Sequence, residues 1–243
     1  IVIHTFPNEQ NSIYGALLSD KSMTGASLQN SWDDVHKRTL QWINESTKAE
    51  RPWFTANDEQ GSAGTGAPPD PGYQGYDATK LGYDLHDIRK QTLWGNLMAG
   101  GAGVEYYFGY KLPENDLVCE DFRSRDRSWE YAKIAIDFYD NSGLPFLEMT
   151  NQNKLIGNGT NEKEKYCLAK EGEVYLVYLG YTNTSSLDLS SVSGSFEVTW
   201  FNPRTGESNL RGKVKRVKGG SKIELGTAPK NFNEDWLVVV KRK

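Results

Sequence analysis

Two adjacent carboxylates, Asp58 and Glu59, stand where a predicted strand gives way to a loop. The segment that carries them begins with residues typical of a buried strand and reads RPWFTANDEQG (51–61). Charged groups beside an apolar core raise the free energy of the folded state, so such groups often belong to a functional site. A carboxylate at such a corner suits a nucleophile or base for glycoside cleavage, which needs two carboxyl groups flanking the bond. The alternative is a solvated loop carboxylate or a helix cap.

Neighbouring side chains of an extended strand point to opposite faces. We therefore expect only one of the two acids to aim into a pocket. We choose Glu59 as the catalytic residue and Asp58 as a supporting or ligand-contacting residue.

Two further predicted strands also end in groups that could do chemistry. His4 closes the run IVIHTF (1–6), and Glu105, Tyr106 and Tyr107 lie in GVEYYF (103–108). His4 is either a hydrogen-bonded strand-end histidine or a contact to a sugar hydroxyl or to Glu59. Glu105 is either buried against a cation or functional, and one of the two tyrosines is expected to line a sugar subsite while the other faces the helices.

Arg125 belongs to a charged loop, EDFRSRD (120–126). This loop is either a solvated set of salt bridges or, if Arg125 reaches the pocket, a bidentate site for an anionic sugar group. Neither glycine-rich run, GSAGTG (61–66) or GGAG (100–103), has the residues of a phosphate-binding or dinucleotide-binding motif. We predict no cofactor and no metal site, since no second histidine lies at ligand spacing from His4.

The elements that must position these residues alternate along the first part of the chain. Periodicity predicts three strands, each followed by a helix, with residues 7–30 as a loop and the helices at 32–47, 82–99 and 128–140. This alternation is typical of βαβ units and a parallel sheet. If the first strand is internal to a longer chain, these units are the last three of a (β/α)8 barrel, which needs eight.

The pattern changes after residue 143. Short alternating segments separated by turn residues predict an antiparallel β-sandwich over 144–243, with strands at 166–169, 174–178, 187–189, 196–201, 213–217, 223–225 and 236–240. We therefore predict two domains, 1–143 and 144–243.

Bulk composition narrows the function classes. The chain has 243 residues, a net charge of -4 and no cluster of Lys and Arg, which argues against a nucleic-acid partner. No apolar run approaches a membrane span. Cys119 and Cys167 are expected to be free thiols. Because the chain starts in what looks like mid-strand, we expect it to be the C-terminal part of a longer polypeptide.

Three motifs together resemble a known family. They are the corner RPWFTANDEQG, the strand entry within IRKQTLWGNLMAGGAGVEYYFGY and the turn in WFNPRTGE. The chain is similar to the C-terminal part of bacterial glycoside-hydrolase-like (β/α)8 barrels that carry a C-terminal β-sandwich often labelled a collagen-binding domain. Such relatives act on plant or algal polysaccharides.

The resemblance implies a role for each candidate residue. Glu59 matches the strand-seven nucleophile of retaining glycosidases, while the acid/base comes from strand four, which this chain lacks. The expected protein is a secreted or periplasmic bacterial glycosidase whose partners are its polysaccharide and the N-terminal remainder of the same polypeptide. The alternative is a non-catalytic carbohydrate- or matrix-binding protein on the same fold.

Overall fold

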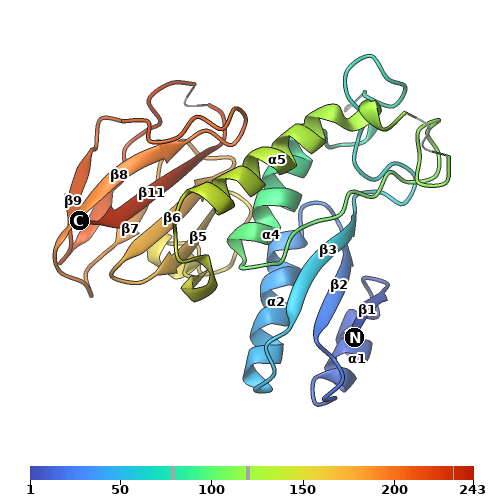
Figure 1. The fold of residues 1–243 in the computed structure, drawn as a ribbon, viewed down its shortest axis with the longest axis horizontal. Coiled ribbons are helices and arrows are strands. Elements are labelled where there is room, and N and C mark those ends of the chain that lie inside the picture. The colour runs from blue at the N-terminus through green and yellow to red at the C-terminus, as the bar shows by residue number, and fades with distance from the viewer. Residues whose placement is uncertain (78–79, 119–120, 232) are drawn as a thin grey trace. The chain divides into compact units, whose positions relative to one another are not determined.

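A computed structural model describes residues 1–77, 80–118, 121–231 and 233–243 (Figure 1). The chain divides into two compact units, Ile1–Glu130 and Tyr131–Lys243. The domain boundary expected between residues 143 and 144 stays a prediction. No helix among the described residues is both long and apolar enough to cross a membrane.

The first unit is built on a three-stranded parallel sheet with the order β1-β2-β3. Two helices connect these strands along the chain. The bounds are β1 (Val2–Thr5), α1 (Gln10–Leu17), β2 (Gly25–Asn30), α2 (Val35–Lys48) and β3 (Phe54–Gln60).

One face of this sheet is packed and apolar. Ala26 and Leu28 of β2 are fully buried in a cluster with Tyr14 of α1, Trp42 of α2 and Trp53. The rings of Tyr14 and Trp42 meet edge to face at 5.0 Å. The Tyr14 hydroxyl donates to the backbone oxygen of Ser27 at 2.7 Å, which ties α1 to the middle of β2. Ser27 and Gln29 alternate with Ala26 and Leu28, so they occupy the opposite face.

The segment after β3 is helical in three short stretches. They are α3 (Leu85–Asp87), the π-helical turn η2 (Ile88–Leu93) and α4 (Trp94–Met98). They lie within the helix predicted for 82–99. An Asp84 capping box begins the first stretch, with the Asp84 side chain accepting from the backbone N–H groups of His86 and Asp87.

The predicted fold class, the last three units of a (β/α)8 barrel followed by a sandwich, is wrong. The described residues form an open three-stranded parallel sheet and separate antiparallel sheets. They do not show the units of a barrel. Two local errors contributed. Residues 7–30, expected to be a loop, contain α1 and β2, while 103–108, expected to be a strand, makes only one parallel bridge, between Val104 and Asn57.

Both errors have a physical cause. The strand β2 (GASLQN) carries only two apolar side chains, because its other face is polar, so its hydrophobic signal is weak. The aromatic run 103–108 reads as a strand, yet its backbone soon leaves β3. The Tyr107 oxygen accepts from Ala67 N at 2.7 Å, and Phe108 N donates to the Asp116 carboxylate at 2.9 Å.

The second unit contains antiparallel sheets. Six strands pair in the order β4-β5-β6-β11-β8-β9, and β10 pairs with β7. Their bounds are β4 (Thr150–Asn151), β5 (Lys165–Lys170), β6 (Val174–Leu179), β7 (Ser186–Asp188), β8 (Ser195–Phe201), β9 (Arg216–Lys218), β10 (Lys222–Glu224) and β11 (Trp236–Arg242). The described residues also form the 3₁₀ turns η3 (Phe122–Arg125), η4 (Phe146–Glu148) and η5 (Asn153–Ile156), and the helix α5 (Asp126–Asn141) follows η3.

The core of the second unit lies between these two sheets. Phe196, Val198 and Trp200 of β8 pack there with Leu187 and Leu225. The helix α5 (Asp126–Asn141) contains the division between the units. Within the second unit its Phe138 ring lies 4.5 Å from the ring of Phe201.

Cys167 is a buried free thiol in β5. Burial raises the pKa of this thiol well above its usual range, so it remains protonated. The other cysteine, Cys119, lies outside the described residues.

Candidate functional site

The exposed face of the parallel sheet carries a row of polar side chains across three strands. In the register, His4 of β1 is opposite Ser27 of β2, and Ser27 is opposite Ala56 of β3. The next pair on this face, towards the carboxyl ends of β2 and β3, is Gln29 with Glu59. Because the other face is filled by α1 and α2, this polar face is where chemistry can take place.

A bulge in β3 places both acids on that face. Leu28 pairs with Asn57 and Gln29 pairs with Glu59, so Asp58 is an extra residue without a partner in β2. A bulge interrupts the alternation of side chains and re-aims them. The expectation that only one of the two acids can point into the site is therefore wrong. Asn57 Nδ2 donates to the Leu28 oxygen at 2.8 Å and fixes the two strands at the bulge.

The His4 imidazole contacts both carboxylates. Its Nδ1 lies 3.1 Å from Asp58 Oδ2, and its Nε2 lies 3.5 Å from Glu59 Oε2. Ser27 Oγ donates to Asp58 Oδ2 from the neighbouring strand. The side chains of Asp58 and Glu59 are 25% and 23% exposed, so they are half-buried yet reachable from solvent.

Burial dominates the electrostatics of this pair. Loss of solvent raises the pKa of Asp58, and the nearby His4 opposes that rise. Loss of solvent also raises the pKa of Glu59, helped by the charges of Asp58 and Asp116 and opposed by His4 and by a hydrogen bond from Gln29. Two neighbouring carboxyl groups with raised pKa values and a shared histidine are typical of a site that handles protons or charge.

Tyr107 and Glu105 lie beside this cluster. The Tyr107 hydroxyl donates to the Ala63 oxygen at 2.8 Å. Its pKa is raised by burial and then by the charges of Glu59 and Asp116, which places the phenol in the same electrostatic environment as Glu59. The backbone of Glu105 is bonded to Asn57 O at 2.8 Å, and its side chain is exposed.

The structure does not bring Tyr106 and Arg125 to this cluster. Tyr106 is buried with its ring 5.4 Å from that of Trp129. Arg125 is fully buried, donates to the backbone oxygens of Ala67 and Glu114 and lies over the Phe108 ring at 4.5 Å. It therefore organises the loops of the first unit.

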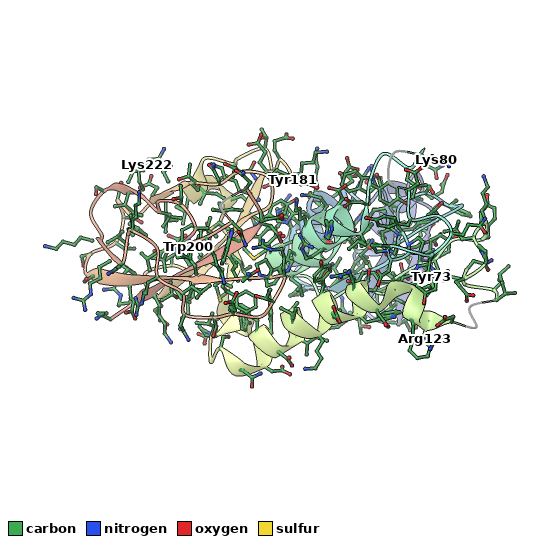
Figure 2. The ribbon with its side chains drawn as sticks, turned by 90° about the horizontal axis from the view of Figure 1, so that it is seen from above. Tyr73, Lys80, Arg123, Tyr181, Trp200 and Lys222 are labelled. Atoms are coloured by element: carbon green, nitrogen blue, oxygen red, sulfur yellow. The ribbon has the colours of Figure 1, made fainter. Side chains whose placement is uncertain are left out.

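The charged loop before α5 contains a solvated salt bridge, one of the two alternatives considered for it. Arg123 Nε donates to Asp121 at 2.6 Å, and the Tyr73 hydroxyl donates to the same carboxylate at 3.4 Å. Tyr73 and Arg123 lie near each other in Figure 2.

Sequence reasoning missed Ser27 and Gln29. The sequence predicts a loop over residues 7–30, and a loop assigns no face to its residues. The available signal was the alternation in GASLQN, in which Ala26 and Leu28 are buried while Ser27 and Gln29 are not. Within the described ranges, no group of three or more His, Cys, Asp or Glu side chains could hold a metal ion.

A separate cavity of about 370 Å³ lies in the second unit. Ile134, Asp137 and Phe138 of α5 line it, together with Glu197 of β8 and Lys241 of β11. Its two acids are already in ion pairs, Asp137 with Lys133 at 2.6 Å and Glu197 with Arg211 at 2.6 Å. We therefore place the candidate chemistry at the His4–Asp58–Glu59 cluster, where the acids face a histidine instead of a salt-bridging cation.

Comparisons with known proteins find one matching family model and solved structures with a similar fold. Residues 151–241 match the family described as "Putative collagen-binding domain of a collagenase". Two solved structures share the fold. One is described as a glycoside hydrolase, with 13% identity, a TM-score of 0.58, 87% of this chain covered and 46% of the other.

The second is a glycoside hydrolase family 5 protein from Bacteroides vulgatus ATCC 8482, with 15% identity and a TM-score of 0.57. The alignment covers 87% of this chain and 45% of that protein. The chain thus spans about half the length of these structures. No curated protein sequence matches it.

Proposed function

We propose that this chain is the nucleophile-bearing part of a retaining glycoside hydrolase that acts on a plant or algal polysaccharide outside the cytoplasm of a bacterium. The observation that carries the proposal is the Glu59 carboxylate, half-buried at the end of β3 and 3.5 Å from His4. The shared fold with glycoside hydrolases supports it.

In the proposed first step, a Glu59 oxygen attacks the anomeric carbon of the bound sugar. The bond to the leaving oxygen breaks, its electron pair stays on that oxygen, and a general acid supplies the proton. We assign that acid to no residue of this chain. In the second step water attacks the same carbon, loses a proton to the conjugate base and releases Glu59 as a carboxylate.

The neighbours of Glu59 have distinct parts in this scheme. An ionised Asp58 only accepts hydrogen bonds, so His4 Nδ1 donates to it and Nε2 is left facing Glu59. Asp58 therefore orients His4, and an imidazole that carries a proton on both nitrogens stabilises the charge on Glu59 through Nε2. In this scheme Tyr107 and Glu105 contact sugar hydroxyls.

Covalent trapping tests the role of Glu59. The complete protein would be incubated with a panel of 2,4-dinitrophenyl 2-deoxy-2-fluoroglycosides, which slow the second step, and digested for mass spectrometry. We expect the sugar adduct on the peptide that contains Glu59, no adduct in Glu59→Gln, and a loss of at least about a thousandfold in kcat for that variant.

Glu45→Gln is the matched control, because Glu45 is an exposed surface acid of α2 paired with Lys48. It should behave as the parent protein. An adduct on another carboxylate, or full turnover by Glu59→Gln, would overturn the assignment.

A second candidate function is non-catalytic binding of a carbohydrate or matrix protein. The match of residues 151–241 to a collagen-binding family favours it. This alternative predicts retention on immobilised polysaccharide or collagen, unchanged by Glu59→Gln, together with no release of reducing ends from any polysaccharide tested.

A further inference from the structure

We propose that Gln29 is a positioning residue for Glu59, holding the carboxylate in the orientation in which it faces His4. This inference rests on the proposed role of Glu59 as the nucleophile. Gln29 itself makes no contact with the reacting atoms in this scheme.

The register of the sheet brings the two residues together. Gln29 is directly paired with Glu59 only because Asp58 is bulged out of β3. Side chains opposite each other in adjacent strands are close enough to interact. The Gln29 side chain also lowers the pKa of Glu59, as a hydrogen-bond donor on the neighbouring strand does.

The chemistry of the two groups decides which of them donates in the proposed hydrogen bond. A carboxylate only accepts, so the amide nitrogen of Gln29 must be the donor. The amide oxygen agrees with this, because among the described residues Gln29 Oε1 is buried and has no hydrogen-bond partner. A buried acceptor without a partner is unfavourable, and an apolar side chain would avoid it. A hydrogen bond from the amide nitrogen of Gln29 to Glu59 explains why an amide side chain occupies this position.

The backbone beneath Gln29 is rigidly held. Gln10 Nε2 donates to the Gln29 oxygen at 2.7 Å, and Gln10 Oε1 accepts from Trp42 Nε1 at 3.2 Å. Gln10 and Trp42 are buried on the packed face of the sheet. A donor fixed in this way can restrict the rotation of a half-buried carboxylate, and a misplaced nucleophile reacts slowly.

The other groups that act on Glu59 are His4, Asp58, Asp116 and Tyr107. Of these groups, only His4 lowers the pKa of Glu59, as Gln29 does. Removing Gln29 as a donor should therefore raise the pKa of Glu59 further and leave His4 as its sole favourable partner.

The test uses the complete protein and two substitutions at one position. Gln29→Leu removes the donor, and Gln29→Glu keeps the shape but adds a third carboxylate beside Asp58 and Glu59. We expect both to raise the pKa of Glu59, followed by ¹³C NMR of its side-chain carboxyl carbon, with the larger rise for Gln29→Glu because like charges disfavour ionisation. We also expect kcat to fall about tenfold to a hundredfold with KM within about twofold.

Gln152→Leu is the control, since Gln152 is in the second unit and its side-chain amide donates to Thr150 Oγ1 at 3.3 Å. It should change neither quantity. An unchanged Glu59 pKa in folded Gln29→Leu or Gln29→Glu would overturn the pairing. A shifted pKa with unchanged kcat would overturn the positioning role. If Glu59→Gln retains turnover, the proposed function fails, while the NMR titration still reports whether Gln29 holds Glu59.

Discussion

Asp58 and Glu59 are consecutive residues of β3, yet both carboxylates face the His4 imidazole, at 3.1 and 3.5 Å. A regular strand would send them to opposite faces. The bulge at Asp58 removes that constraint and gives one histidine two acidic partners. The chemistry of the site follows from this single irregularity.

Replacing His4 tests the electrostatic part of this arrangement. His4 lowers the pKa of both Asp58 and Glu59 against the effect of burial. In His4→Asn both pKa values should rise further, so a larger fraction of Glu59 is protonated at a given acidic pH. Because the nucleophile must be ionised, we expect the acidic limb of the profile of kcat/KM against pH to move to higher pH.

The measurement is a pH–rate profile of the complete protein on its substrate, with carboxyl ¹³C NMR titration as a readout that needs no substrate. An acidic limb in the same place for His4→Asn and the parent would contradict the pairing.

The charge on Glu59 is expected to lower the stability of the fold. Its pKa is raised in the folded state, so the folded protein binds the proton more tightly than the unfolded chain does. Stability from this group is therefore fully present below the unfolded pKa and is lost as pH rises through the folded pKa.

Glu59→Gln removes the titration. We expect it to match the parent in acid and to exceed it at neutral pH by about 0.5–1 kcal/mol in the free energy of unfolding. Urea unfolding at both pH values measures this. Greater stability of the parent at neutral pH would show that the carboxylate is stabilising.

The buried ion pair of Arg204 and Asp235 should be important for the second unit. Asp235 is completely buried, Arg204 Nη1 lies 3.1 Å from its Oδ1, and the Tyr178 hydroxyl donates to its Oδ2 at 2.7 Å. The guanidinium also stacks over Trp236 at 5.0 Å. Arg204→Met should cost about 3 kcal/mol, since it leaves a buried charge without its cation.

Lys230→Met is the matched control for urea unfolding of the two variants. Lys230 and Glu207 form an ion pair at 2.7 Å whose side chains are 47% and 44% exposed. Exposed pairs contribute little, so the change should stay within about 0.5 kcal/mol. Equal losses for both variants would show that burial does not govern these pairs.

Local sequence signals predicted the elements with strong periodicity. The helix α2, the strand β3 and strands β5, β6, β8 and β11 were all expected close to their observed positions. The sequence prediction missed elements with one polar face, such as β2, because half of their residues lack the apolar signal on which the prediction depends. The run 103–108 has strand composition, but its partners are loop residues that are distant in sequence.

The sequence by itself determined that two acids end a buried strand and that His4 ends another, since residue type and hydrophobic alternation are local properties. Only the tertiary structure decided that these groups meet, that Ser27 and Gln29 join them and that Arg125 does not. The pairing register and the bulge that set these neighbours are properties of hydrogen bonding between strands, and a sequence read one segment at a time does not contain them.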